Sequence, residues 1–254
     1  MFFTDVVYVG IDPASGRKSF TYAALDKGLK LIALADAESE DLAAFLGAQK
    51  SAVVAVNAPS HVNCGFVRRK LESQSLALGL HQIRGADMRL AEYELRGRGI
   101  VVGGTPRRVE SCPSWMQAGF SLYSQLSKMG FEPSPAQEAP YQWLETHPHA
   151  CFCVLLEQPP LPRPTLEGRL QRQLMLYERG VGVRDVMDYF EEITRFKLLK
   201  GILPAEIVYA PEFLDVLVAA YTAWMSVHKP EEVSRLGEPE EGLITLPGPL
   251  REKY

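Results

Sequence analysis

The sequence predicts an α/β protein built around a mixed β-sheet. Short, almost wholly apolar runs at 6–11 and 53–56 are typical of strands that are covered on both faces. A three-residue turn, Asp26-Lys27-Gly28, joins two strand-like runs and indicates a hairpin. A helical pattern precedes the run at 53–56, and strand, crossover helix and strand together are typical of parallel pairing.

The first strand is Val-Val-Tyr-Val-Gly-Ile at 6–11, followed by Asp12 and Pro13. Because a proline disfavours helical backbone at the residue before it, we expect Asp12 in extended backbone at the end of this strand. Residues 18–25 and 29–35 predict two more strands. With so short a turn between them, the first three strands should form an antiparallel meander.

The later elements alternate between helices and strands. Residues 37–49 carry apolar side chains at helical spacing, which predicts the crossover helix, right-handed by default. Residues 141–144 form the last strong strand candidate and end at Glu145. Further helices are expected over 114–129, 165–178, 184–198 and 211–227.

Length and composition limit the class of protein. The chain has 254 residues, of which 46% are hydrophobic and 23% charged, so collagen-like, coiled-coil and fully disordered proteins are excluded. A net charge of −4 excludes a uniformly basic coat for nucleic acid but not a local basic face. We expect a single domain over 1–254, with a basic, mostly helical insertion at about 61–130 and an irregular acidic tail at about 229–254.

The cysteines and the apolar runs bear on compartment. Four scattered cysteines are too few for a disulfide scaffold, so we expect reduced thiols, a cytoplasmic protein and no disulfide-linked partner. Asp5 stands where a signal peptide needs apolar residues. No run approaches the about 18 apolar residues of a membrane helix, and we expect no membrane partner.

Three carboxylates stand in positions that favour a metal site. Asp12 and Glu145 end strands, and Asn57 ends the strand at 53–56. Asp215 lies in a helix that is apolar nearly all round, where a lone charge is costly unless it is paired or bound to metal. Sites in open sheets form outside the carboxyl ends of strands. Converging carboxylates there suit Mg²⁺ or Mn²⁺.

Simpler explanations exist for each of these residues. An Asp-Pro pair after a strand is often only a turn, and Asp215 can instead pair with a buried arginine or bond a backbone group. Glu145, His147 and His149 are a conceivable zinc set, although Pro148 interrupts the spacing. Cys151 and Cys153 nearby are interpreted as small buried hydrophobic residues.

Basic and aromatic residues of the insertion could contact nucleic acid. The adjacent pairs Arg68-Arg69 and Arg107-Arg108 could hold phosphates by charge, or could belong to a solvated helical face. Trp115 could stack on a base, although an aromatic residue in an amphipathic helix is more often part of the core. No Walker-type loop, Gly-x-Ser-x-Gly elbow or dinucleotide-binding glycine pattern follows a predicted strand.

An ordered series of short motifs, running from about residue 6 to 247, resembles the domain-of-unknown-function family numbered 429, which is described as predicted RNase H-like nucleases. The motifs are Val9-Gly-Ile-Asp-Pro-Ala-Ser-Gly16, Val54-Ala-Val-Asn-Ala-Pro59, Arg89-Leu-Ala-Glu92, Gly99-Ile with Thr105-Pro106, Glu145-Thr-His-Pro148, Glu167-Gly-Arg169, and Asp215 with Ala219-Ala-Tyr-Thr-Ala223.

The resemblance implies an RNase H-like fold: a five-stranded sheet of order 3-2-1-4-5 with strand 2 antiparallel, flanked by helices. In the RNase H-like pattern acids stand at the end of strand one, at or near the end of strand four, and on a late helix. Asp12 and Asp215 match the first and last, and Glu145 matches the family's Glu-x-His-Pro motif. Asn57 is a departure, because the family usually has Asp there, and a neutral amide should weaken at least one metal.

The leading hypothesis is therefore a metal-dependent nuclease that uses one or two Mg²⁺ or Mn²⁺ ions on DNA or RNA. Asp12 would be the central ligand, Glu145 and Asp215 would complete the shell, and Asn57 would be a weak ligand or orient water. Two alternatives remain: a nucleic-acid-binding relative without activity, and a nucleotide-phosphate-binding protein. The expected substrate contacts are Ser15, Arg68, Arg69, Arg107, Arg108 and His147.

Overall fold

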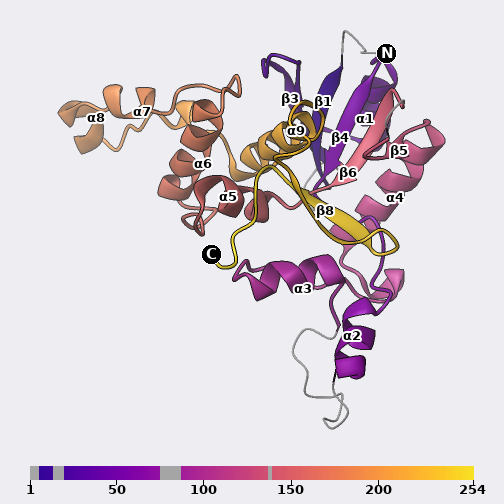
Figure 1. Cartoon of the computed structure of the whole chain (residues 1–254). Helices are drawn as coiled ribbons and strands as arrows, with labels where there is room; N and C mark the ends of the chain where they lie inside the picture. The colour runs from indigo at the N-terminus through magenta and orange to yellow at the C-terminus, as the bar shows by residue number, and fades with distance from the viewer. Residues whose placement is uncertain (1–5, 14–19, 75–86, 137–138) are drawn as a thin grey trace.

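The computed structural model of the chain describes residues 6–13, 20–74, 87–136 and 139–254. Within these residues eight strands form one mixed sheet, and helices cover both of its faces (Figure 1). The strands are β1 (Val7–Pro13), β2 (Phe20–Leu25), β3 (Leu31–Ala37), β4 (Ala52–Val56), β5 (Glu132–Pro133), β6 (Tyr141–Glu145), β7 (Ser234–Glu238) and β8 (Gly242–Leu246).

The sheet has eight strands rather than the five that we expected. Its order is β3-β2-β1-β4-β6-β8-β7, and the two-residue β5 pairs with β6 beside this path. The strands expected from the sequence are β1 to β4 and β6. Strand β2 is antiparallel to both β1 and β3, whereas β1, β4 and β6 run parallel. This arrangement brings the carboxyl ends of β1, β4 and β6 to one edge of the sheet.

The expectation of an irregular tail over 229–254 is wrong, because β7 and β8 form a hairpin there that extends the sheet from β6. Leu236, Ile244 and Leu246 are buried on it. Glu241 is also buried and accepts hydrogen bonds from the backbone N–H groups of Cys64, Phe66 and Leu90. The acidic composition of residues 229–254 favoured a solvated, irregular segment. Glu241 is instead a buried hydrogen-bond acceptor, so composition gave no sign of the strand pairing.

Two apolar layers hold the sheet. One face packs against α9, α5 and α3, and the other against α1 and α4. The helices are α1 (Ser39–Gly47), α2 (Phe66–Gln74), α3 (Leu90–Gly97), α4 (Ser114–Lys128), α5 (Pro148–Leu156), α6 (Leu166–Glu178), α7 (Asp188–Glu191), α8 (Arg195–Leu199) and α9 (Pro211–His228), with 3₁₀ turns at Val109–Ser111 and Ala205–Ile207.

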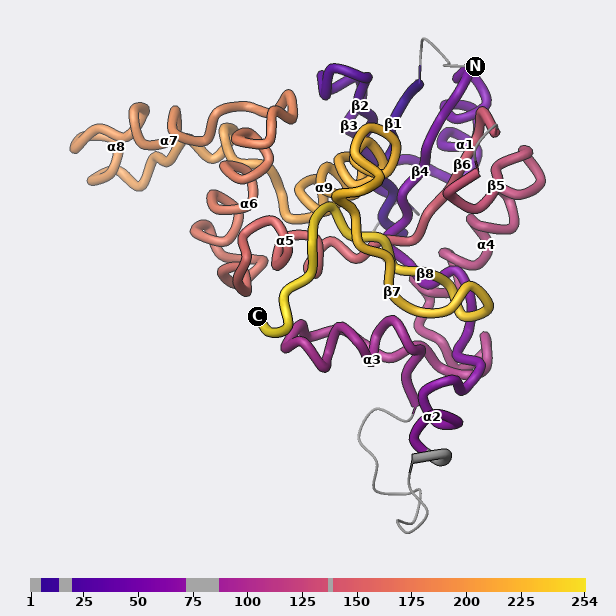
Figure 2. Tube along the Cα trace, viewed as in Figure 1, coloured from indigo at the N-terminus to yellow at the C-terminus, as the bar shows by residue number. Residues whose placement is uncertain are grey.

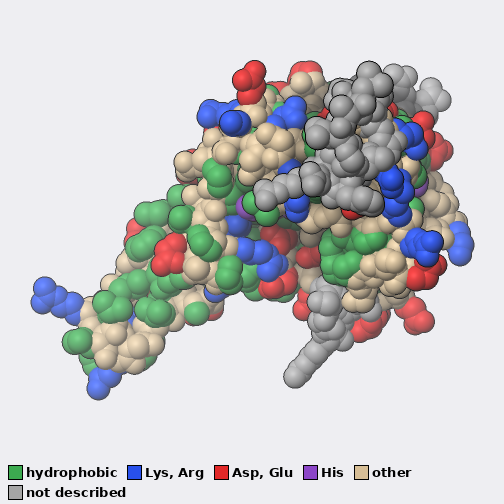
Figure 3. Space-filling model, turned by 90° about the horizontal axis from the view of Figure 1, so that it is seen from below, with side chains coloured by type: hydrophobic (Ala, Val, Ile, Leu, Met, Phe, Trp, Pro, Cys, Tyr) green, Lys and Arg blue, Asp and Glu red, His purple; other side chains and the backbone are tan. Residues whose placement is uncertain are grey.

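An arm made of α7 and α8 projects from the body of the protein (Figure 1). One continuous helix was expected over 184–198, but the chain breaks at Thr194, whose hydroxyl accepts from the N–H of Lys197 and caps α8. Seen from below, hydrophobic side chains cover much of the arm (Figure 3), among them Phe196 and Leu199.

The end of the chain lies beside α3 (Figure 2). The N–H of Tyr254 donates to the carbonyl of Arg98 at 2.8 Å. The segment that carries α3 is therefore bound to the body from two sides, by this contact and by the β7–β8 turn.

The apolar stretch Ala205–His228, which contains α9, is long enough to cross a membrane by length and composition alone. Of its most apolar 18-residue stretch, 67% is buried inside the protein, as in a core helix.

Strand β1 and helix α9 pack unusually closely at Gly10. A Cβ atom at Gly10 would lie 2.0 Å from the carbonyl oxygen of Val216 and 2.5 Å from the backbone nitrogen of Ala220. No side chain fits in this space, so glycine is required for the helix to lie at this distance from the strand.

We predict that Gly10→Ala destabilises the protein by about 3 kcal/mol, because the new methyl group meets backbone atoms that cannot rotate away. The free energy of unfolding in urea measures this effect. Gly97→Ala is the control, since a Cβ there has no neighbour within 4 Å among the described residues. Equal stability of the two variants would contradict the packing described here.

Candidate functional site

Asp12 and Asn57 lie side by side where β1 and β4 end. The N–H of Asn57 donates to the carbonyl of Ile11 at 2.8 Å, which continues the parallel pairing by one residue. The Asn57 side-chain amide then donates to Asp12 Oδ1 at 3.0 Å. Asp12 and Asn57, two of the three residues expected together at the strand ends, therefore meet there.

Asp215 reaches the same place from α9. It is 6% exposed, and its Oδ2 accepts from Arg163 Nε at 2.7 Å. Arg163 also contacts Glu212 at 3.4 Å, and its side chain is 44% exposed. Asp215 is thus paired with an arginine, which is the alternative that a lone charge in an apolar helix left open.

Burial makes ionisation of both carboxylates costly, and the charge of Asp215 adds to the cost for Asp12. Burial, and then the negative charge of Asp215, raise the pKa of Asp12 to about 6, against the opposing hydrogen bond from Asn57. Burial also raises the pKa of Asp215, although the positive charge of Arg163 opposes this. Such a pair attracts cations, and Arg163 is the cation that now faces it.

These side chains line a cavity of about 410 Å³ outside the carboxyl ends of the strands. It is open on one side, and α9 and the first turn of α4 contribute to its walls. The lining residues are Asp12, Pro13, Asn57, Trp115, His147, Pro148, His149, Arg163, Arg172, Glu212 and Asp215.

Two neutral histidines belong to this lining. His147 caps α5, because its Nδ1 accepts from the N–H of Ala150, and this leaves the ring proton on Nε2. Burial lowers the pKa of His147 to about 4, and burial also lowers the pKa of His149. Pro148 begins a helix here, so the extended Glu-x-His-x-His spacing of a zinc site is absent.

Arg172 is the second arginine of the cavity, and it is held firmly. Its Nη1 donates to the carbonyls of Leu161 and Gly168 at 2.8 Å each, and its guanidinium lies 5.3 Å from the ring centre of Phe152. Arg163, by contrast, is bonded to two carboxylates and to no other group among the residues that the structure describes. The cavity therefore holds one fixed cation and one that is free to exchange its partner.

Glu145 does not join Asp12 and Asp215. In the sheet Ile11, Val56 and Glu145 are in register, so Glu145 points to the face opposite to that of Asp12. Trp143, two residues earlier, packs into the layer of α1 and α4. The one-residue offset between Asp12 and Glu145 across the sheet separates two acids that both stand at strand ends in the sequence.

Glu145 is instead the partner of Arg89, which is 1% exposed. Arg89 Nη1 and Nη2 donate to the two carboxylate oxygens of Glu145 at 2.9 and 2.5 Å, and Ser60 N–H donates at 2.8 Å. Arg89 Nε donates to Glu92, which also accepts from Thr105. This buried network lines a second cavity of about 100 Å³, which shares Asn57, Trp115 and His147 with the first.

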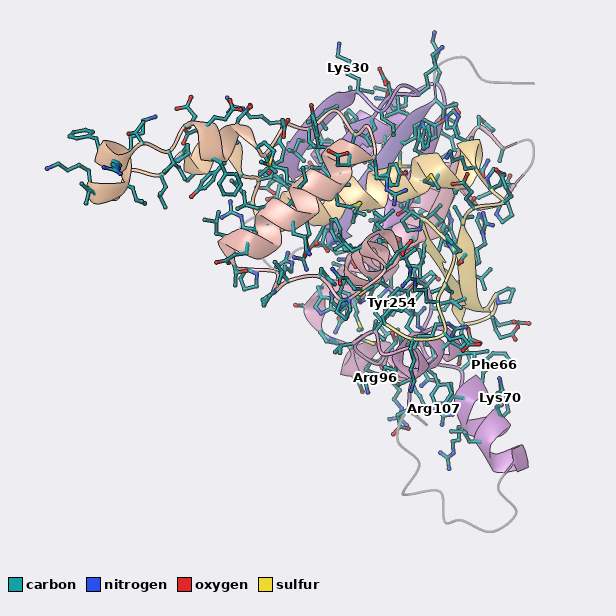
Figure 4. All side chains as sticks on the ribbon, turned by 60° about the vertical axis from the view of Figure 1, so that its left-hand side comes forward. Lys30, Phe66, Lys70, Arg96, Arg107 and Tyr254 are labelled. Atoms are coloured by element: carbon teal, nitrogen blue, oxygen red, sulfur yellow. The ribbon has the colours of Figure 1, made fainter. Side chains whose placement is uncertain are left out.

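The expected phosphate contacts lie elsewhere. Arg68 and Arg69 lie on α2, and Arg69 stacks over the ring of Phe66 at 4.4 Å. Arg107 lies at the same end of the molecule as Phe66 and Lys70 (Figure 4), and Arg107 and Arg108 are exposed. None of the four lines either cavity described above. Ser15 lies outside the described residues.

The donor set suits a hard cation. Asp12 and Asp215 offer carboxylate oxygens, and the amide of Asn57 has an oxygen left when its nitrogen donates to Asp12. Mg²⁺ is often held by one or two carboxylates with water in its other positions. Among the described residues no group of three or more His, Cys, Asp or Glu side chains is close enough to hold a metal. The oxygens of Asp12, Asp215 and Asn57 are of the type that a hydrated Mg²⁺ ion takes as ligands.

Comparison with known proteins identifies the family of this chain. A family model described as "Protein of unknown function (DUF429)" matches residues 10–241. The chain belongs to this family. No curated protein and no solved structure matches it.

Sequence reasoning missed four charged residues of this DUF429 protein. Arg163, Arg172 and Glu212 line the cavity, and Arg89 holds Glu145. The sequence carried a signal for one of them, since a lone Asp215 in an apolar helix requires a cation. It could not show which arginine, because 52 residues separate Arg163 from Asp215.

We predict that Glu145→Gln destabilises the protein by about 3–5 kcal/mol, because it leaves the charge of buried Arg89 only partly compensated. Urea unfolding measures the loss. The control is Glu157→Gln, which removes an exposed ion pair with Arg251 and should have little effect. A similar small effect for both variants would show that the Arg89 network does not hold the fold.

We predict that Asp12→Asn stabilises the protein by about 1–3 kcal/mol at pH 7–8. Since the pKa of Asp12 is raised in the folded state, the folded protein binds this proton more tightly than the unfolded chain. Ionising Asp12 therefore costs stability as the pH rises from about 4 to about 6, and the cost persists above that. The gain should be absent at pH 4. Thermal unfolding across this range measures it, and a gain that is the same at pH 4 would contradict the prediction.

Proposed function

We propose that this protein is a metal-dependent phosphodiesterase of RNase H-like fold that acts on nucleic acid, with Asp12 and Asp215 as the residues that hold Mg²⁺ or Mn²⁺. The observation that carries the proposal is the convergence of these two carboxylates, 203 positions apart, in one open cavity at the carboxyl ends of parallel strands. The strand order β3-β2-β1-β4-β6, with β2 antiparallel, supports the RNase H-like fold.

The charge distribution of the cavity supports a phosphodiester substrate. Arg172 offers a fixed positive charge. Arg163 has an exposed side chain, and its partners among the residues that the structure describes are Asp215 and Glu212. The guanidinium of Arg163 would bind an anion at the cavity mouth, and would bind it more strongly when a divalent ion holds Asp215. A bound divalent ion would supply stabilisation of negative charge on the phosphate oxygens and a more acidic water.

The chain's own residues position the reacting groups in this proposal. Asn57 orients the Asp12 carboxylate through its hydrogen bond, and neutral His147 holds a proton on Nε2. Glu145 is left out of the metal shell because Arg89 occupies both of its oxygens. Two carboxylates suit one ion better than two, so we propose a single ion.

A second candidate function is binding of nucleic acid without cleavage. It is favoured by Asn57, which replaces an acid with a neutral amide, and by the arginine partners of Asp215 and Glu145. In this case Arg163 would remain on Asp215, and the protein would bind its ligand with or without a divalent ion.

We predict that the wild-type protein binds Mn²⁺ with a stoichiometry of one, and that Asp12→Asn and Asp215→Asn each weaken binding at least about tenfold. Because Asp12 is protonated below its pKa of about 6, affinity should fall as the pH drops through that value. Arg163→Gln should bind Mn²⁺ more tightly, since it removes the competing cation. Calorimetry measures all four of these, with the exposed Asp87→Asn as the unaffected control.

Cleavage of labelled DNA and RNA with Mn²⁺ completes this test. The proposal expects cleavage by the wild type and none by Asp12→Asn. Undiminished cleavage by Asp12→Asn would reject the assignment. Binding of nucleic acid in EDTA, with no cleavage in any divalent metal, would establish the second candidate instead.

A further inference from the structure

Helix α4 passes unusually close to the strand ends that carry the cavity. A Cβ atom at Gly119 would lie 2.4 Å from the Cβ of Ala58 and 3.8 Å from the ring of Pro13. Residues four apart share one face of a helix, so Trp115 projects from the same face as Gly119. The missing side chain at Gly119 therefore lets the helix bring Trp115 down to the ends of β1 and β4.

Trp115 is not fully packed into the core. It is only partly buried, and it lines both the 410 Å³ and the 100 Å³ cavities, together with Asn57 and His147. Residues deeper in α4, such as Leu122 and Leu126, are fully buried. An indole at the wall of an open cavity offers a flat apolar surface to a ligand.

The same cavity offers partners for an anion. Arg163 and Arg172 come from the side of α6 and α9, whereas Trp115 comes from the helix on the other face of the sheet. A ligand that uses both must carry a planar ring at one end and a negative group at the other. A nucleotide has this combination.

We propose that the cavity binds one unstacked nucleotide of a single strand, with its base against Trp115 and its phosphate toward Arg163 and Arg172. The proposal deepens the proposed function and names its substrate as single-stranded nucleic acid. Within a duplex each base is stacked and paired, so its face is closed to an aromatic side chain. A cavity of about 410 Å³ is in the size range of sites that hold one small ligand.

The test compares adenosine 5′-monophosphate with ribose 5-phosphate, which differ only in the base, in EDTA. A protein with Trp143→Phe and Trp224→Phe keeps Trp115 as its only tryptophan. We expect adenosine monophosphate, but not ribose 5-phosphate, to quench its fluorescence, and to bind at least about tenfold more tightly, because base stacking on an aromatic residue favours it. Equal binding of the two ligands, or no quenching, would overturn the proposal.

Two variants of the wild-type chain separate the base from the phosphate by calorimetry. Trp115→Ala should lose the tenfold preference for adenosine monophosphate, whereas Trp115→Phe should keep most of it. Arg163→Gln should weaken both ligands by the same factor, since both carry the phosphate. An unchanged preference in Trp115→Ala would refute the role of the indole even if the double variant does not fold.

Binding of labelled oligonucleotides extends the test to the substrate. A twelve-nucleotide single strand should bind at least about tenfold more tightly than the same sequence as a duplex at equal salt. Preference for the duplex would overturn the proposal. These measurements need no divalent ion, so a failure here leaves the Mn²⁺ results standing, and absence of Mn²⁺ binding would leave the nucleotide site standing without the nuclease.

Discussion

The contact between β1 and α9 at Gly10 is the constraint on which the candidate site depends. Gly10 and Asp12 lie two residues apart on a strand and so face the same side of the sheet. Asp215 and Ala219 lie four apart on α9 and share one face of that helix, and Ala219 contacts the Gly10 position. Because no side chain separates strand from helix here, Asp12 and Asp215 face the same cavity. The closeness of these two elements therefore determines the geometry of the carboxylate pair.

Alternation along the strands explains why a third acid is not part of this pair. Glu145 is in register with Ile11 and Val56, and these face away from α9. On that side it meets Arg89, whose fully buried guanidinium joins the end of β6, the start of α3 and the turn between β7 and β8. Glu145 therefore has a structural role. Through its pairing with Arg89, the insertion and the C-terminal hairpin are attached to the sheet.

The buried carboxylates of the cavity lower the stability of the folded protein when they are ionised. Two buried carboxylates face one another, and burial raises the pKa values of both. The compensation is incomplete, since among the described residues Asp12 accepts a hydrogen bond from the neutral amide of Asn57, whereas Asp215 is paired with the charged Arg163. Buried ionisable groups with shifted pKa values are typical of sites that bind or transform a ligand. Arg163, which is half exposed and is bonded to the carboxylates of Asp215 and Glu212, is the group through which such a site would change state.

The sequence alone determined the strands β1 to β4 and β6, the meander, the parallel crossover, and the placement of Asp12 and Asn57 at one edge. These follow from local apolar patterns, turn residues and chain connectivity. It also showed that Asp215 needs a partner. Only the tertiary structure decided that the partner is Arg163, that Glu145 belongs to Arg89, and that residues 229–254 add two strands. Each of these depends on which side chains meet across the sheet, and a one-residue difference in register, invisible in the sequence, turns an acid from one face to the other.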